Sequence, residues 1–250
     1  QGREQLHGED FRGFTLLPFS EDQITAYLAA ALPGRDPHQV LELFASIHNL
    51  AEMAERPVTL AMLTREVGRI EAIRGIRGEL TAAELYRELV RSWMDRDDGK
   101  HQLSPAHKQL LMEQVAARLW REKRRGWTAE EAEDWLVALL RARPEMAAHY
   151  EGVRRELFKL DLRNATCLVR AGDEFRFAHT SLQEFFLAAF LLRALRERRP
   201  DDWALPVPSR ETLDFLGQML LRDAVALAGF AALRDVYRPQ ASELLLHYTL

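Results

Sequence analysis

The chain has 250 residues, of which 47% are hydrophobic and 29% are charged, and its formal net charge is -4. A chain of this length and composition can bury a substantial core, which excludes a disordered tail, and its charge gives no general attraction to nucleic acid or anionic membranes. The single cysteine, Cys167, excludes an internal disulfide framework and a zinc site with several cysteine ligands. A lone cysteine is typical of a reducing compartment, so we expect a cytoplasmic protein.

The chain begins with QGREQLHGED, which has no initiator Met, no basic region and no apolar region. We therefore expect no signal peptide and interpret the chain as a piece of a longer protein. Two apolar segments, 182–195 and 215–233, have to be judged as candidate membrane spans. The first contains a Gln-Glu pair and the second an Arg-Asp pair, so both are predicted to be core helices and no membrane contact is expected.

Two helix start signals stand in the first part of the chain. Ser20 and Gln23, in PFSEDQITAYL, have the spacing of a capping box, in which each side chain bonds the backbone N–H of the other residue. Thr81 and Glu84, in LTAAELYRELV, repeat that spacing ahead of an apolar stripe. Both patterns predict a helix that begins at the next residue.

The following hundred residues combine helices with the one strand signal that the sequence offers. SPAHK marks one helix start, with Ser104 as the capping residue, and TAEE marks another, with Thr128 and Glu131 as the capping pair. Two short apolar runs, 167–169 and 175–177, flank an Ala-Gly-Asp turn and predict a β-hairpin. Helices before and after a hairpin give the element order of a winged-helix unit.

The predicted fold class is mainly α: a helical bundle domain, then a winged-helix domain with one short β-hairpin, then further helices. The charged run DRDDGK, 95–100, is the predicted boundary between the first two domains. The domain prediction is a linker at 1–18, a helical domain at 19–98, a winged-helix domain at 99–200 and the start of a C-terminal helical segment at 201–250.

The stretch FRFAHTSLQEFFLAAFLL places polar residues in an apolar segment. Thr180 or Ser181 can cap the helix that begins at this point, with Gln183 or Glu184 as the capping-box partner. His179 would then lie between a strand and a helix N-terminus. Free backbone N–H groups and the positive end of the helix dipole make that position a natural site for an anion or a phosphate.

Several motifs resemble one family in their order along the chain. F-x-H-x-S-x-Q-E-F, from Phe177 to Phe185, resembles the winged-helix signature of NACHT-type signal-transduction NTPases, a class that includes NOD-like immune receptors and bacterial defence proteins. GFTLLPFSEDQITAYL resembles the linker and first helix of the helical domain that follows the NTPase core in that family. MAERPVTLAMLTREV and LTAAELYRELVRSWMDRD are similar to the P-x-x-L-x-x-L and T-x-x-x-L-Y helices of the same domain. The resemblance covers residues 14–195.

The resemblance implies ligand contacts for two residues. Pro57 matches the proline that packs against the adenine in the family, and His179 matches the histidine that contacts the phosphates of ADP and holds the closed, inactive state. No G-x-x-x-x-G-K-[ST] loop and no Walker B strand occur in the sequence, so we expect no catalytic residue and no nucleotide hydrolysis by this chain alone.

The resemblance also implies what the longer protein would do. Its NTPase core would lie upstream of Gln1 and would bind ADP or ATP with Mg²⁺, whereas this chain by itself needs no cofactor. The implied function is the regulatory part of a nucleotide switch, which locks onto ADP and controls ATP-driven oligomerisation in signalling or defence. The implied partners are the NTPase core and further copies of the same protein.

Interpreted from the residues alone, two other functions stay open. His179 can be a capping or core histidine of a helical scaffold that has no nucleotide role. A winged-helix DNA-binding regulator would read DNA with EGVRRELFKLDLRNA, 151–165, but acidic residues balance the basic ones there. No metal site is expected, because no histidine has ligands at matching spacing, and Cys167 is expected to be a buried, inert thiol.

Overall fold

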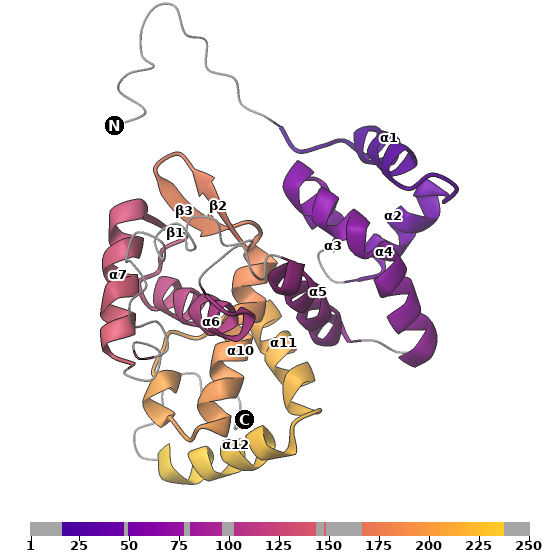
Figure 1. Ribbon diagram of the computed structural model, residues 1–250. Helices are drawn as coiled ribbons and strands as arrows, with labels where there is room; N and C mark the ends of the chain where they lie inside the picture. The colour runs from indigo at the N-terminus through magenta and orange to yellow at the C-terminus, as the bar shows by residue number, and fades with distance from the viewer. Residues whose placement is uncertain are drawn as a thin grey trace, which may run out of the picture. The chain divides into compact units, whose positions relative to one another are not determined.

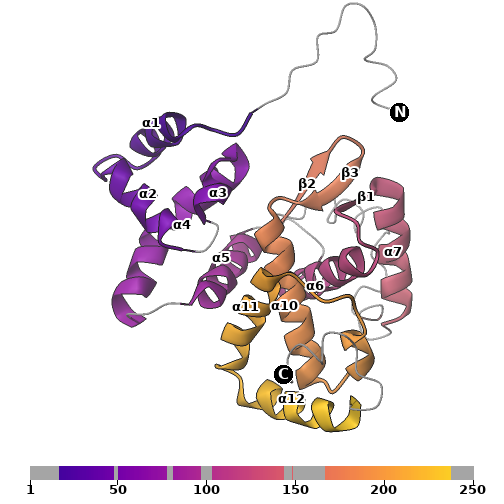
Figure 2. The same ribbon diagram turned by 180° about the vertical axis from the view of Figure 1, so that it is seen from behind.

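The computed structural model describes residues 17–47, 50–77, 81–96, 103–143, 148 and 167–237. The chain forms two compact units, which divide between Ile73 and Arg74. Both units are mainly helical, and the second also contains a small antiparallel sheet, as Figure 1 and Figure 2 show from opposite sides. The predicted fold class is therefore confirmed. None of the helices in the described ranges combines the length and the apolar character that a membrane span needs.

The described residues of the first unit form four helices: α1 Glu21–Ala31, α2 Pro37–Ala45, α3 Leu50–Ala54 and α4 Pro57–Arg77, the last of which crosses the division. Its core contains Leu28, Phe44, Met53 and Leu60, each at most 1% exposed. The predicted capping box at the start of α1 is confirmed, because the Ser20 hydroxyl accepts from the Gln23 N–H and the Gln23 side chain accepts from the Ser20 N–H.

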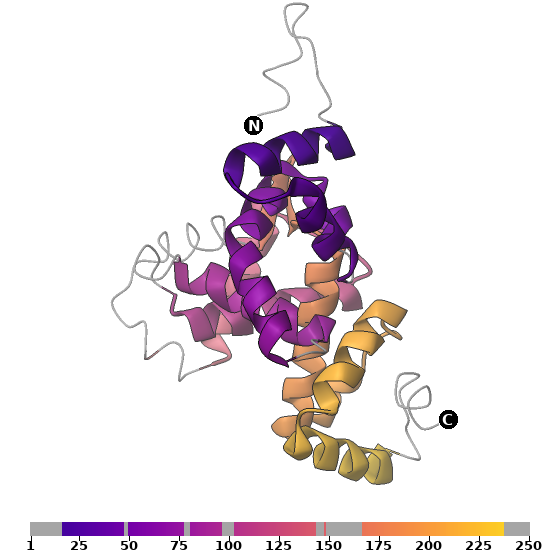
Figure 3. The ribbon, with the colours of Figure 1, turned by 90° about the vertical axis from the view of Figure 1, so that its right-hand side faces the viewer.

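The second unit contains the remaining elements, which follow one another along the chain as α5 Ala82–Arg96, α6 Pro105–Arg121, β1 Gly126–Thr128, α7 Ala129–Arg141, β2 Leu168–Ala171, β3 Glu174–Phe177, α10 Thr180–Arg196, the 3₁₀ turn η2 Pro200–Trp203, α11 Arg210–Leu220 and α12 Ala224–Tyr237. Helix α10 is central, because it contacts α6, α11, α12, η2 and β3. Figure 3 shows α11 and α12 beside it. Phe186, Phe190 and Leu191 of α10 are completely buried.

The predicted hairpin forms, and a third strand joins it. Strands β2 and β3 pair antiparallel, and the turn between them contains Gly172, whose φ of 67° lies in the region that favours glycine. Strand β1 pairs with the other edge of β3. The sequence prediction missed β1, because three residues, GWT, are too short to show alternation. A Cβ at Gly126 would lie 2.8 Å from the Phe175 carbonyl oxygen, so glycine allows β1 to approach β3.

The compact units divide at a different place from the predicted domain boundary. Helix α5 lies in the second unit, where the Tyr86 ring contacts the rings of Phe185 and Phe215 and the Ala83 N–H donates to the Gln218 side chain at 2.9 Å. Helices α11 and α12 belong to the same unit because they pack on α10. The charge of the run at 95–100, as a feature of the sequence, carries no information about these apolar contacts.

One buried ion pair ties α6 to α10. Glu113 is 1% exposed, and Arg193 donates to its two carboxylate oxygens, from Nε at 2.5 Å and from Nη2 at 3.0 Å. Gln109 donates to the same carboxylate at 3.0 Å. The hydrogen bonds to Glu113 are the main reason that the pKa of Arg193 is raised above its usual value.

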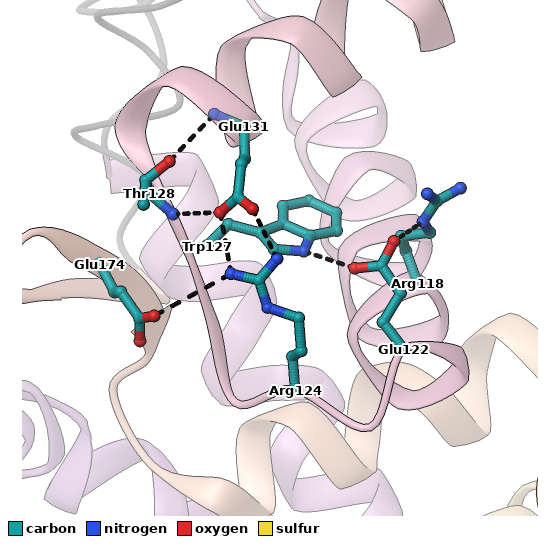
Figure 4. Close-up of polar contacts among 7 residues, drawn as sticks. All are labelled: Arg118, Glu122, Arg124, Trp127, Thr128, Glu131 and Glu174. Atoms are coloured by element: carbon teal, nitrogen blue, oxygen red, sulfur yellow. Dashed lines mark hydrogen bonds and ion pairs between the residues drawn. The ribbon is translucent and has the colours of Figure 1, made fainter.

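A second polar cluster fixes the junction between β1 and α7 (Figure 4). The predicted capping box is confirmed, because Thr128 and Glu131 bond each other's backbone N–H groups at 2.9 and 3.2 Å. Arg124 donates to both carboxylate oxygens of Glu131, at 2.7 and 2.8 Å, and the Trp127 indole donates to Glu122 at 2.9 Å. These bonds orient the short strand β1 before α7 begins.

The carboxylate of Glu131 should report on this cluster in an acid titration. Its pKa is lowered from 4.5 to about 2, chiefly by the hydrogen bonds from Arg124 and then by the Thr128 N–H. Because the folded pKa is depressed, the contribution to stability is complete above pH 4.5 and is lost as the pH falls toward 2. Arg124→Ala should raise the pKa of Glu131 part of the way back to 4.5, as measured by carboxyl ¹³C NMR.

Arg118→Ala is the matched control for that titration, because Arg118 pairs with Glu122 and not with Glu131. It should leave the pKa of Glu131 in place. A Glu131 that still titrates near 2 in the Arg124→Ala variant would show that Arg124 is not the cause of the shift.

Candidate functional site

His179 is the N-cap of α10. Its backbone is extended, with φ -145° and ψ 149°, and its Nδ1 accepts a hydrogen bond from the Ser181 N–H at 3.2 Å. The imidazole therefore satisfies one of the N–H groups that a helix N-terminus leaves without an intrahelical partner. Only 4% of His179 is exposed. The sequence prediction placed His179 correctly at the strand-to-helix junction, but it assigned the cap to Thr180 or Ser181.

Ser181 lies between His179 and Tyr86 in the interior of the unit. The Ser181 hydroxyl is 2.7 Å from His179 Nδ1, and the Tyr86 hydroxyl donates to it at 2.8 Å. Ser181 is 0% exposed and Tyr86 is 1% exposed. Three polar side chains from α5 and the start of α10 thus meet within an aromatic core. Tyr86 stands in the T-x-x-x-L-Y motif but was not selected as a site residue, because an isolated Tyr on an apolar stripe indicates only a core position.

The prediction of a capping box with Gln183 or Glu184 was wrong. Because the N-cap is His179, the third helical residue is Leu182, whose N–H bonds the His179 carbonyl at 3.1 Å. Glu184 is 8% exposed and accepts a hydrogen bond from the Ser209 hydroxyl at 3.0 Å. Ser209 is itself the N-cap of α11, so Glu184 helps to fix the start of that helix against α10.

Pro57 is the first residue of α4 and is exposed. Proline suits this position, because the first helical N–H has no intrahelical partner to lose. Pro57 lies in the first compact unit and His179 in the second, so the two predicted site residues belong to separate units.

The remaining predicted features give no further site. Cys167 is buried, and burial raises the pKa of its thiol to about 12, so the reactive thiolate is disfavoured. Within the ranges that the structure describes, no group of three or more His, Cys, Asp or Glu side chains is placed to hold a metal ion. The segment considered for DNA reading, 151–165, lies outside the described residues.

Comparison with known protein families supports the winged-helix interpretation. The family model of the winged helix-turn-helix domain C-terminal to NACHT matches residues 82–192. Comparison with curated proteins gave no match. The family match begins at the first residue of α5 and ends within α10, and it contains His179, Ser181 and Tyr86. It describes a winged-helix domain and not an NTPase domain. Residues 82–192, a little less than half of the chain, therefore match the winged helix-turn-helix domain that lies C-terminal to NACHT.

Proposed function

We propose that the chain is the regulatory part of a NACHT-type nucleotide switch and that its histidine helps to hold ADP. The observation that carries the proposal is the position of His179, at the N-terminus of a 17-residue helix inside the matched winged-helix segment. The positive end of the helix dipole favours an anion at such a position. A diphosphate is the anion that the resemblance to NACHT NTPases implies.

Pro57 would make the second contact with the nucleotide. It is exposed at the start of α4, and its ring has no N–H that packing on a base would leave unsatisfied. In this proposal the nucleotide is held by an NTPase core upstream of Gln1. By the resemblance to NACHT NTPases, Pro57 would pack on the adenine and His179 would contact the phosphates.

The switch requires that His179 distinguishes the two nucleotide states. A histidine that meets the phosphates only in the closed, ADP-bound form stabilises that form, and exchange for ATP releases the winged-helix domain and permits oligomerisation. A hydrogen bond to a charged group contributes about 1.5–3 kcal/mol. That corresponds to roughly 10- to 150-fold in the equilibrium between the closed and open forms.

The 4% exposure of His179 sets a condition on this contact. A phosphate oxygen can reach the ring only when the residues around His179 move aside. The same burial favours a second candidate function, a helical scaffold in which His179 only caps α10, so an experiment has to separate capping from nucleotide contact.

His179→Asn makes that separation. Asn is as good an N-cap as any residue, so this variant should keep its stability, whereas His179→Ala should lose about 0.5–2 kcal/mol. Both variants lack the imidazole, so in a protein extended upstream of Gln1 both should lose ADP and carry more ATP. Denaturation of the purified proteins, followed by chromatography of the released nucleotide, measures this result.

His38→Asn is the matched control, because His38 lies in the first turn of α2, in the other compact unit. It should leave the nucleotide content unchanged. If His179→Asn keeps the ADP content and oligomeric state of the wild type, the nucleotide contact is contradicted and the scaffold function takes its place.

A further inference from the structure

Three buried polar groups form a chain of hydrogen bonds that ends on His179. The Tyr86 hydroxyl donates to the Ser181 hydroxyl oxygen at 2.8 Å, and that oxygen is 2.7 Å from His179 Nδ1. The Ser181 backbone N–H bonds the same ring nitrogen at 3.2 Å. All three residues are at most 4% exposed, so the bonds lie in a region of low dielectric, where they are strong and directional.

The backbone bond decides which ring nitrogen carries the proton. A backbone N–H can only donate, so His179 Nδ1 has to accept and cannot bear a hydrogen. The Ser181 hydroxyl then also donates to Nδ1, and Tyr86 donates to Ser181, so that the bonds run in one direction from Tyr86 to His179. The ring is consequently neutral, with its proton on Nε2.

We propose that Tyr86 and Ser181 are positioning residues, which hold His179 in the Nε2–H form and thereby make it a hydrogen-bond donor for a phosphate oxygen. The opposite tautomer would present a lone pair at Nε2, and a lone pair repels an anionic oxygen. The functional consequence rests on the proposed nucleotide switch. The tautomer of the imidazole does not depend on that switch, and it can be measured without any nucleotide.

The hydrogen bonds that end on His179 depend on the position of α5, because Tyr86 belongs to that helix. Its ring lies 5.7 Å from the Phe185 ring and 5.0 Å from the Phe215 ring, centroid to centroid, so aromatic packing fixes where its hydroxyl points. Helix α5 is the first helix that lies wholly in the second compact unit. A shift of α5 that separates Tyr86 from Ser181 breaks the hydrogen bond between their hydroxyls. The orientation of the His179 ring is then less firmly fixed. The histidine is therefore a donor of fixed orientation only while the Tyr86 hydroxyl stays bonded to Ser181.

The test is a long-range ¹H–¹⁵N NMR spectrum of the whole 250-residue chain at pH 7, with the His179 signals assigned from their loss in His179→Asn. We expect the wild type to show an unprotonated Nδ1 and a protonated Nε2. In Ser181→Ala the ratio of the two tautomers should fall by roughly fivefold, the factor that one hydrogen bond of about 1 kcal/mol represents. Tyr86→Phe keeps the aromatic packing. It should change the ratio of the two tautomers in the same sense as Ser181→Ala, but by a smaller factor.

Tyr27→Phe is the matched control, because it removes a tyrosine hydroxyl from α1, in the other compact unit. It should leave the ¹⁵N signals of both ring nitrogens of His179 unchanged. A protonated Nδ1 or an equal mixture of tautomers in the wild type would overturn the proposal without any variant. The proposal would also be overturned if Tyr86→Phe and Ser181→Ala shifted the ¹⁵N signals of the His179 ring no more than Tyr27→Phe does. An Nε2–H tautomer in the 250-residue chain, together with no ADP in a protein extended upstream of Gln1, would refute the nucleotide switch and leave the positioning role intact.

Discussion

Arg193→Ala is expected to lower the free energy of unfolding by about 3–5 kcal/mol, because it leaves the Glu113 carboxylate buried without its counter-ion. Glu113 is 1% exposed, and Arg193 supplies two of its hydrogen bonds. The amide of Gln109 remains, but it carries no charge. Urea unfolding followed by tryptophan fluorescence measures the effect, since all five tryptophans lie in the second compact unit.

Arg118→Ala is the matched control for this prediction. Arg118 lies on the same helix as Glu113, and its ion pair with Glu122 is exposed, so the loss should be less than about 1 kcal/mol. Replacement of both Glu113 and Arg193 by Leu should be less harmful than Arg193→Ala, because no buried charge is left alone. Equal losses for Arg193→Ala and Arg118→Ala would contradict the view that burial sets the cost.

Gly229→Ala should destabilise the second unit by about 1–3 kcal/mol, because α12 crosses α10 with no room for a side chain. A Cβ at Gly229 would lie 2.5 Å from the carbonyl oxygen of Leu195 and 3.1 Å from its carbonyl carbon. Both are backbone atoms, which cannot rotate away as a side chain can. A shift of α12 would also disturb the contact between the Phe230 and Trp203 rings, whose centroids are 6.0 Å apart.

Gly217→Ala provides the comparison, since Gly217 lies in α11 and a Cβ there would meet no atom within 4 Å. That substitution should raise the free energy of unfolding by roughly 0.5–1 kcal/mol, because alanine favours the helix. Thermal or urea unfolding of the two variants should therefore shift in opposite directions. If both glycines could be replaced without loss, the close approach of α12 to α10 would be wrong.

The parts of the fold that depend on local signals could be predicted from the sequence. The capping boxes at Ser20 and Thr128 and the hairpin around Gly172 form as predicted, because a cap or a tight turn requires particular residues at neighbouring positions. The same holds for His179, whose position between a strand and a helix follows from the order of the elements around it.

The remainder depends on contacts between residues far apart in the chain. The place of α5 is decided by aromatic contacts of Tyr86 with α10 and α11, and the bond from Ser209 to Glu184 spans 25 residues. No local pattern contains that information. The capping role of His179 was only one of the alternatives that the sequence left open, because histidine is not among the preferred N-cap residues and two preferred ones, Thr180 and Ser181, follow it directly.

The nucleotide content of the wild-type protein tests the central claim most directly. A protein extended upstream of Gln1 would be purified without added nucleotide and denatured, and the released nucleotide would be identified and counted per chain. The nucleotide switch predicts close to one ADP per chain. A protein that is folded but releases no nucleotide would contradict it and would leave His179 as the N-cap of a buried helix.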